Sequence, residues 1–149
     1  MAERDFAGII GHVSSIMRIA VVSDIHGNLK ALEAVLADIA TRSVDLIVNL
    51  GDALSGPLLP AECAHRLIPL MLPTIRGNHE RQLLTLSSEE MGLSDRYTES
   101  CLRPDHCRWI AGFPESLWLL PGVLMVHGTP YSDVAYWLES VDENGLHPA

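Results

Sequence analysis

The stretch "PTIRGNHE", residues 73–80, ends a short apolar run with an amide, an imidazole and a carboxylate behind a glycine. The stretches "VVSDIHGN" (21–28) and "VNLGD" (48–52) repeat this design, in which an apolar run leads into polar residues around a glycine. In an open α/β sheet, ligands bind beyond the carboxyl ends of the strands, which lie side by side. The recurrence therefore predicts a polar site at the ends of neighbouring strands.

The rest of the chain predicts an α/β fold with a parallel layer first and antiparallel strands later. Residues 18–24 and 45–50 are expected strands, and the continuous apolar run over 19–22 in the first is typical of a strand covered on both faces. Residues 28–41 between them have helical periodicity, with Asn28 as the N-cap. We expect the remaining elements in this order: a helix over 61–70, a strand over 73–76, a helix from Gly77 to Leu86, a polar stretch over 87–99, a short helix over 104–111, a hairpin turning at Pro121–Gly122, and a last helix over 132–140 with no further strand.

Length and composition limit the class of protein. The chain has 149 residues, of which 48% are hydrophobic and 19% charged, which suits one globular domain. The net charge is -9 and Lys30 is the single lysine, so bulk attraction to nucleic acid is excluded. No apolar run approaches the roughly 20 residues of a membrane span. We expect residues 1–16 to be an N-terminal extension and residues 17–149 to form the domain.

The side chains at the polar tips form a set of metal ligands. They are carboxylate, imidazole and amide groups without a thiolate, namely Asp24, His26, Asp52, Asn78 and His127. Each alone has an ordinary explanation as a cap or turn residue. Together they predict a site for divalent Mn, Fe, Zn, Co or Ni. Two such ions about 3.5–4 Å apart, sharing one carboxylate, can activate water and clamp a phosphoryl group, which would let a chain of negative net charge hold a phosphate.

The motifs "SDIHGN", "NLGD", "RGNHE" and "VHG", in this order, resemble the calcineurin-like metallophosphoesterases. The resemblance covers roughly residues 17–138 and is strongest to the small bacterial phosphoesterases. It implies an α/β fold in which a β-sandwich is flanked by helices. It also implies an enzyme that hydrolyses phosphomonoesters or phosphodiesters at a dinuclear metal centre.

The resemblance also implies a role for each residue at the tips. The first metal would be bound by Asp24 and His26, the second by Asn78 and His127, and Asp52 would bridge both. His79 would not be a ligand. It would be the catalytic residue that faces the scissile phosphate and stabilises or protonates the leaving oxygen.

Two features depart from the family pattern. The family ends in a "GHTH"-type motif, but only His147 follows Gly128, so we expect a domain truncated at its C-terminus. The motif "GDALSG" also lacks the second acidic residue that many relatives carry. The alternative function is therefore a catalytically impaired remnant that binds a partner.

Several expectations concern partners and location. The substrates implied are phosphorylated small molecules, nucleotides or phosphoproteins, with no membrane partner. Three cysteines without zinc-finger pairing suit the reducing cytoplasm. An apolar strand edge left uncovered by truncation would favour a homo-oligomer. We expect the tryptophans to pack in the core, namely Trp109, Trp118 and Trp137.

Overall fold

The computed structural model of the chain describes residues 16–136, 139–142 and 145–148, and side chains up to residue 136. The elements in chain order are β1 (Ile19–Val22), α1 (Leu29–Ala40), β2 (Leu46–Asn49), α2 (Pro60–Leu67), the 3-10 helix η2 (Ile68–Leu70), α3 (Asn78–Thr85), α4 (Leu93–Cys101), α5 (Pro104–Ala111), β3 (Ser116–Leu120), β4 (Val123–Val126), β5 (Glu139–Asp142) and β6 (Gly145–Pro148). The expected extension over 1–16 lies outside the described residues except for Ile16, and it stays a prediction.

The first three elements form the expected parallel crossover. Strands β1 and β2 pair in parallel, with Ile19 opposite Leu46 and Val22 opposite Asn49. Helix α1 connects them, and its N-cap Asn28 accepts a hydrogen bond from the main-chain N–H of Ala31 at 3.1 Å. This arrangement brings the ends of β1 and β2 to the same edge of the sheet.

The strand expected over 73–76 is reduced to a single parallel bridge between Asn49 and Thr74. Pro73 has no N–H to donate to a ladder, although its main-chain oxygen accepts from Asn49 at 2.9 Å. After the bridge the chain turns away, because the N–H of Arg76 donates to Pro114. The expected strand is thus too long, but its tip still lies beside the end of β2.

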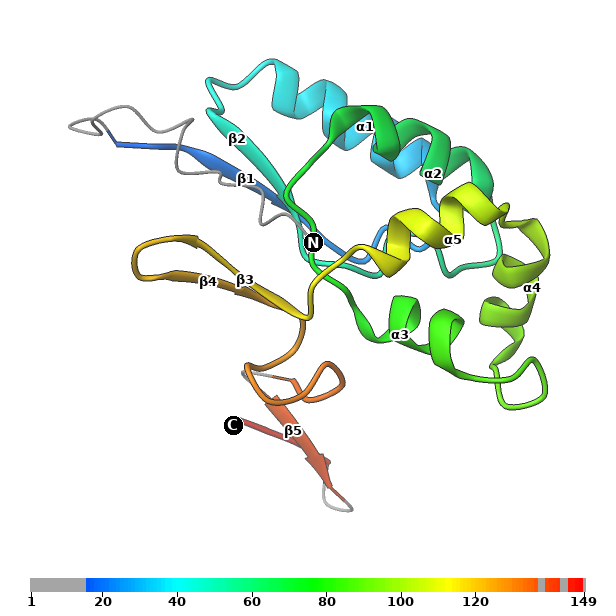
Figure 1. Cartoon of the computed structure of the whole chain (residues 1–149). Coiled ribbons are helices and arrows are strands. Elements are labelled where there is room, and N and C mark those ends of the chain that lie inside the picture. Colours follow the sequence, from blue (N-terminus) through cyan, green and yellow to red (C-terminus); the bar gives the residue numbers. More distant parts are fainter. Residues whose placement is uncertain (1–15, 137–138, 143–144, 149) are drawn as a thin grey trace.

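The core has two parts, one on each side of the parallel strands (Figure 1). On the helical side, Ile47 packs against a cluster from α1, α2 and α5 that includes Leu36, Leu67 and Ile110. On the other side, Val48 packs against Met125 of the β3–β4 hairpin. Since successive side chains of a strand point to opposite faces, β2 joins both parts. A helix layer, a parallel layer and an antiparallel layer result, as expected for a β-sandwich flanked by helices.

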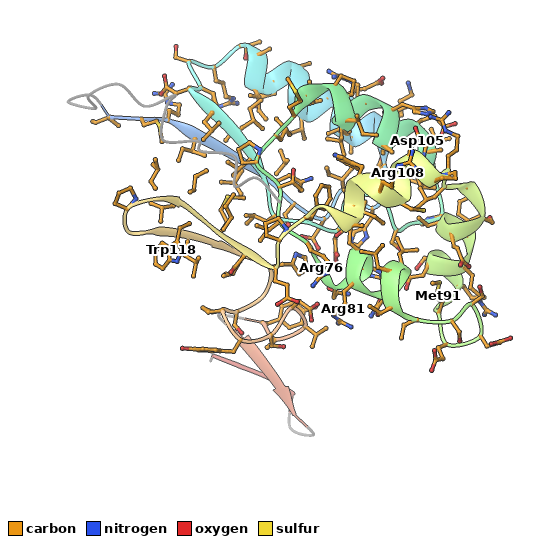
Figure 2. All side chains as sticks on the ribbon, in the orientation of Figure 1. Arg76, Arg81, Met91, Asp105, Arg108 and Trp118 are labelled. Atoms are coloured by element: carbon orange, nitrogen blue, oxygen red, sulfur yellow. The ribbon has the colours of Figure 1, made fainter. Side chains whose placement is uncertain are left out.

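The hairpin turning at Pro121–Gly122 is confirmed, with β3 and β4 antiparallel. One expectation about its side chains is wrong, because Trp118 on β3 is 66% exposed and points away from the core (Figure 2). Trp109 packs against the helical core, while Trp137 lies outside the described residues.

Two expectations about helices are wrong. The polar stretch over 87–99 contains most of α4, whose buried residues Asp95 and Thr98 are polar and therefore hid its inner face. The helix expected over 132–140 is not found in its described part. Residues 132–136 are irregular and Glu139 begins β5, which pairs with β6 where no further strand was expected.

Candidate metal centre

The loops after β1 and β2 run side by side and are joined by main-chain hydrogen bonds. The N–H of Asp24 donates to Gly51 at 3.1 Å, and the N–H of His26 donates to Asp52 at 3.0 Å. Asp24, His26 and Asp52 all have positive φ angles, of 54°, 49° and 54°. Such angles are uncommon for side-chain-bearing residues and gather at functional sites. The loops thus turn sharply and present three polar side chains at one edge.

The tip behind Thr74 joins the other two through a close approach of glycines. A Cβ on Gly51 would lie 2.3 Å from the nitrogen of Gly77, so no other residue fits there without displacing the backbone. Glu80 in α3 is fully buried and accepts hydrogen bonds from the N–H groups of Asp52, Ala53 and Gly77. Burial raises the pKa of Glu80 and the charge of Asp52 adds to this rise, although the three N–H donors oppose it. Glu80 therefore holds the second and third tips together.

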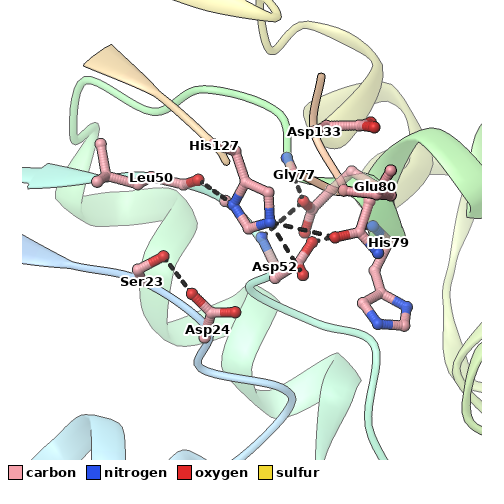
Figure 3. A network of polar contacts seen from close by, with 12 residues as sticks. Ser23, Asp24, Leu50, Asp52, Gly77, His79, Glu80, His127 and Asp133 are labelled. Atoms are coloured by element: carbon pink, nitrogen blue, oxygen red, sulfur yellow. Dashed lines mark hydrogen bonds and ion pairs between the residues drawn. The ribbon is translucent and has the colours of Figure 1, made fainter. Parts of the chain in front are cut away.

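Two histidines at the site are anchored through one ring nitrogen and present the other. Nδ1 of His26 donates to the main-chain oxygen of Ser55 at 2.7 Å. Nδ1 of His127 donates to the main-chain oxygen of Leu50 at 2.8 Å, as Figure 3 shows. Each Nε2 then faces a carboxylate, at 3.6 Å from Asp24 and 3.4 Å from Asp52 respectively. An imidazole whose far N–H is fixed by a carbonyl is the usual arrangement of a metal-binding histidine.

Asp52 is the most buried carboxylate among the predicted ligands, at 2% exposure. Burial acts to raise its pKa, but hydrogen bonds from His127 and from the main chain of His79 outweigh burial, so its pKa lies below the usual value. The same contact raises the pKa of His127 to about 9, against the opposing effect of burial. Asp52 is therefore ionised, and its charge stabilises a cationic group next to it, here the imidazolium of His127.

Asn78 begins α3 and turns its amide toward the same point. The amide atom facing the site lies 3.2 Å from His127 Nε2 and from Asp52 Oδ2, and 3.3 Å from the main-chain oxygen of Asp133. A nitrogen at this place donates to these acceptors. If the amide oxygen occupies this place, it adds one more oxygen atom to the carboxylate and carbonyl oxygens around it, and such a group of oxygens binds a cation. The donor set therefore fits a divalent metal ion.

His79 is oriented by a residue that the sequence analysis missed. Its Nδ1 lies 2.8 Å from Oδ1 of Asp95 in α4, and Asp95 is also hydrogen-bonded to the hydroxyl of Ser55. Asp95 is only 3% exposed. No local signal in the sequence points to Asp95, because its contacts with Ser55 and His79 join residues far apart in the chain.

The six predicted site residues all lie around one cavity of about 570 Å³. Within it are two groups whose potential ligand atoms lie within 4.8 Å of one another, and both groups contain Asp52. The first adds His26 and His79, and the second adds Asp24 and His127. A shared carboxylate between two groups is the geometry expected of neighbouring cations.

The sequence profile of the family described as "Calcineurin-like phosphoesterase" matches residues 17–147. The chain belongs to the calcineurin-like phosphoesterases. The ordered motifs that surround the cavity thus agree with the match along nearly the whole chain.

Solved structures agree with the family, and one curated protein is similar in sequence. A metallophosphoesterase from Sphaerobacter thermophilus superposes with a TM-score of 0.68 and 33% identity, over 84% of this chain and 53% of that one. A structure described as "a putative diadenosine tetraphosphatase" superposes with a TM-score of 0.63 over 91% of this chain and 65% of that one, and its 23% identity supports the fold alone. The uncharacterized protein MJ0912 of Methanocaldococcus jannaschii is 32% identical over 103 residues, which are 64% of this chain and 42% of that protein.

The calcineurin-like chain described here therefore spans about half the length of these relatives. None of its described helices is long and apolar enough to cross a membrane.

Proposed function

We propose that this chain hydrolyses a phosphomonoester or phosphodiester at a centre of two divalent metal ions, drawn from Mn, Fe, Zn, Co and Ni. The observation that carries the proposal is the pair of overlapping ligand groups that share the buried Asp52. Three side chains in each group would leave coordination positions for water and substrate, as in catalytic metal sites.

The ligand assignment is the one that the family resemblance implies: Asp24 and His26 would hold the first metal, Asn78 and His127 the second, and Asp52 both. All five side chains line the cavity. The ligand groups in the structure support the shared Asp52, although they place Asp24 with His127 and His26 with His79. When bound, the two ions would neutralise phosphoryl oxygens and lower the pKa of water. The main-chain bonds that fix the Nδ1 atoms of His26 and His127 keep both rings turned toward the cavity.

His79 is proposed as the residue that gives a proton to the leaving oxygen. Asp95 Oδ1 accepts a hydrogen bond from Nδ1–H, which leaves Nε2 to give a proton toward the cavity. The main-chain N–H of His79 donates to Asp52 Oδ1 at 2.9 Å, so the backbone at this position is also fixed. Both contacts hold the ring before a substrate arrives, which reduces the reorganisation that proton transfer requires.

The grouping of His79 with His26 and Asp52 supports a second assignment, in which His79 is a metal ligand. The variant His79→Ala separates the two roles. A lost proton donor lowers turnover about 10²–10⁴-fold with metal content unchanged. A lost ligand lowers metal content as well.

The substrate stays within the classes expected from the sequence, which are small phosphorylated molecules, nucleotides and phosphoproteins. The name of the diadenosine tetraphosphatase neighbour is compatible with a nucleotide, but at 23% identity it supports the fold alone. The cytoplasmic location is likewise a proposal that rests on cysteine usage.

The test of the proposal is hydrolysis of p-nitrophenyl phosphate and bis-p-nitrophenyl phosphate by purified protein with Mn²⁺, beside its metal content. Turnover with two bound metals is the expected result, and His79→Ala should lower it less on these nitrophenyl esters than on an alkyl phosphate, whose leaving group needs the proton. Metal binding without turnover of either ester would support the alternative, a catalytically impaired protein that acts by binding.

A further inference from the structure

One wall of the cavity is formed largely by apolar side chains, unlike the polar ligand groups. Val134, Ala135 and Tyr136 line it, and they follow β4 on the segment 128–136. Val134 is 62% exposed and Tyr136 is 77% exposed, so an aromatic ring and a branched aliphatic side chain are open to a ligand. The ligand groups that would hold metals are polar, whereas this wall is largely apolar.

The segment that carries the wall is held in place by its own contacts. Arg81 of α3 binds both carboxylate oxygens of Asp133, at 2.5 and 3.0 Å. The N–H of Thr129 donates to the main-chain oxygen of Ser132 at 2.8 Å. Gly128 has a φ of +75°, and a Cβ there would lie 2.6 Å from that same oxygen. The wall is therefore preformed beside the first turn of α3 (Figures 1 and 2).

The charges around the cavity limit what the ligand can carry. Among the described residues, no arginine or lysine lines the cavity. The guanidinium groups of Arg81 and Arg76, on or beside α3, are paired with Asp133 and Glu115. Further phosphates beyond the one at the metal centre would therefore lack the cationic partners that phosphates usually have.

We propose that Val134, Ala135 and Tyr136 form a subsite for the leaving group of the substrate, and that this group has a flat uncharged ring. The substrate class is then an ester of an aryl or nucleoside alcohol with a single phosphoryl group, and not a linear polyphosphate. This inference rests on the proposed function, because it places the phosphoryl group at the metal centre. Tyr136 supplies the stacking face.

The test compares two phosphonates that cannot be hydrolysed, by calorimetry on Mn²⁺-loaded protein. We expect 1-naphthylmethylphosphonate to bind about tenfold tighter than methylphosphonate, since stacking on an aromatic side chain has an effect of this order. Tyr136→Ala should remove most of this preference and Tyr136→Phe should keep it. Tyr131→Ala is the matched control, because Tyr131 is 97% exposed on the same segment but does not line the cavity.

A comparison of the dissociation constants of AMP and ADP at fixed free Mn²⁺ tests the prediction that a second phosphate has no cationic partner. Equal or weaker binding of ADP supports the proposal, and ADP binding tenfold tighter than AMP would overturn it.

In the phosphonate experiment, the proposal would be overturned by a wild-type protein that does not prefer the naphthyl ring, or by a Tyr136→Ala variant that keeps the preference. Ring-dependent binding without turnover of any ester supports the subsite and contradicts the proposed function. Turnover without a preference for the ring supports the proposed function and contradicts the subsite.

Discussion

At the scale of single residues, the site is built with strained backbone. Asp24, His26 and Asp52 each adopt a left-handed conformation, which costs a residue with a Cβ about 1–2 kcal/mol. The main-chain bonds between the two loops and the buried Glu80 offset this cost by fixing the turns. The three side chains thereby reach the cavity from turns whose backbone is fixed.

Asp95 is predicted to position His79 for proton transfer. Asp95→Asn should lower turnover of an alkyl phosphate by about 10–100-fold, as for other lost partners of functional histidines. Turnover of p-nitrophenyl phosphate should fall less, because that leaving group needs little help from a proton. Steady-state rates on both esters, beside metal content, provide the measurement.

The matched control for this prediction is Asp105→Asn, which removes an exposed carboxylate paired with Arg103 on another helix. It should leave both rates unchanged. An equal loss on the two esters in Asp95→Asn, or a loss of bound metal, would show that Asp95 supports the fold or the metals and not the proton donor.

Cys63 should be inert to alkylation over the physiological pH range. It is fully buried, and burial, helped by the charges of Glu62 and Glu33, raises its pKa to about 11. Because only the thiolate reacts, a raised pKa means that labelling increases only as the pH approaches that value. Mass spectrometry after iodoacetamide treatment at pH 7–10 is the measurement, with the exposed Cys107 as internal control. Labelling of Cys63 as fast as Cys107 at pH 7.5 would contradict the prediction.

At the scale of elements, the sequence predicts what depends on local signals. The crossover and the hairpin follow from apolar runs and turn residues, and Gly51 and Gly77 mark the tips that carry the ligands. Helix α4 was missed because its inner face is polar and is satisfied only by tertiary contacts. Asp95 was missed for the same reason, since its contact with His79 forms only after α4 has packed.

The sequence predicts a helix over 132–140, but the described residues 132–136 are irregular. Asp133 is bound to Arg81, and the main chain of Ser132 is paired locally with Thr129. The ion pair joins residues 52 positions apart, and no local pattern in the sequence reveals such a contact.

The Arg81–Asp133 pair is predicted to keep the segment after His127 close to Asn78, whose amide faces the main-chain oxygen of Asp133. Arg81→Ala should weaken the second metal site severalfold, and its stability cost should stay near 1 kcal/mol because both side chains are about a third exposed. Mn²⁺ calorimetry and thermal unfolding measure the two effects.

The control is Arg42→Ala, which removes an equivalent two-point pair with Asp38 on the far end of α1. It should leave Mn²⁺ binding unchanged. If Arg81→Ala also leaves it unchanged, the ion pair does not organise the metal centre.

At the scale of the whole molecule, apolar surface remains open on the described part of the chain. Val21 on β1 and Val35 on α1 line a cavity of about 290 Å³ and are 58% and 45% exposed. In the described residues β1 pairs only with β2, so its other edge is free to pair with another strand. Trp118 adds an exposed ring on the hairpin.

We predict that this chain associates with itself through the free edge of β1. Sedimentation velocity at several concentrations should show a concentration-dependent dimer, and Val21→Lys should shift the equilibrium to the monomer. Trp118→Lys is the comparison, because it adds the same charge on a different sheet. A monomer at every concentration would contradict the prediction.

The central claim is that one buried carboxylate joins two metal sites in this member of the calcineurin-like phosphoesterases. Metal titration of the purified chain, read as bound Mn²⁺ or Zn²⁺ per protein, tests it most directly. We predict two equivalents for the wild type, at most one for Asp52→Asn, and two for the control Asp38→Asn, whose carboxylate lies on the surface of α1. Two equivalents retained by Asp52→Asn, or no more than one in the wild type, would contradict it.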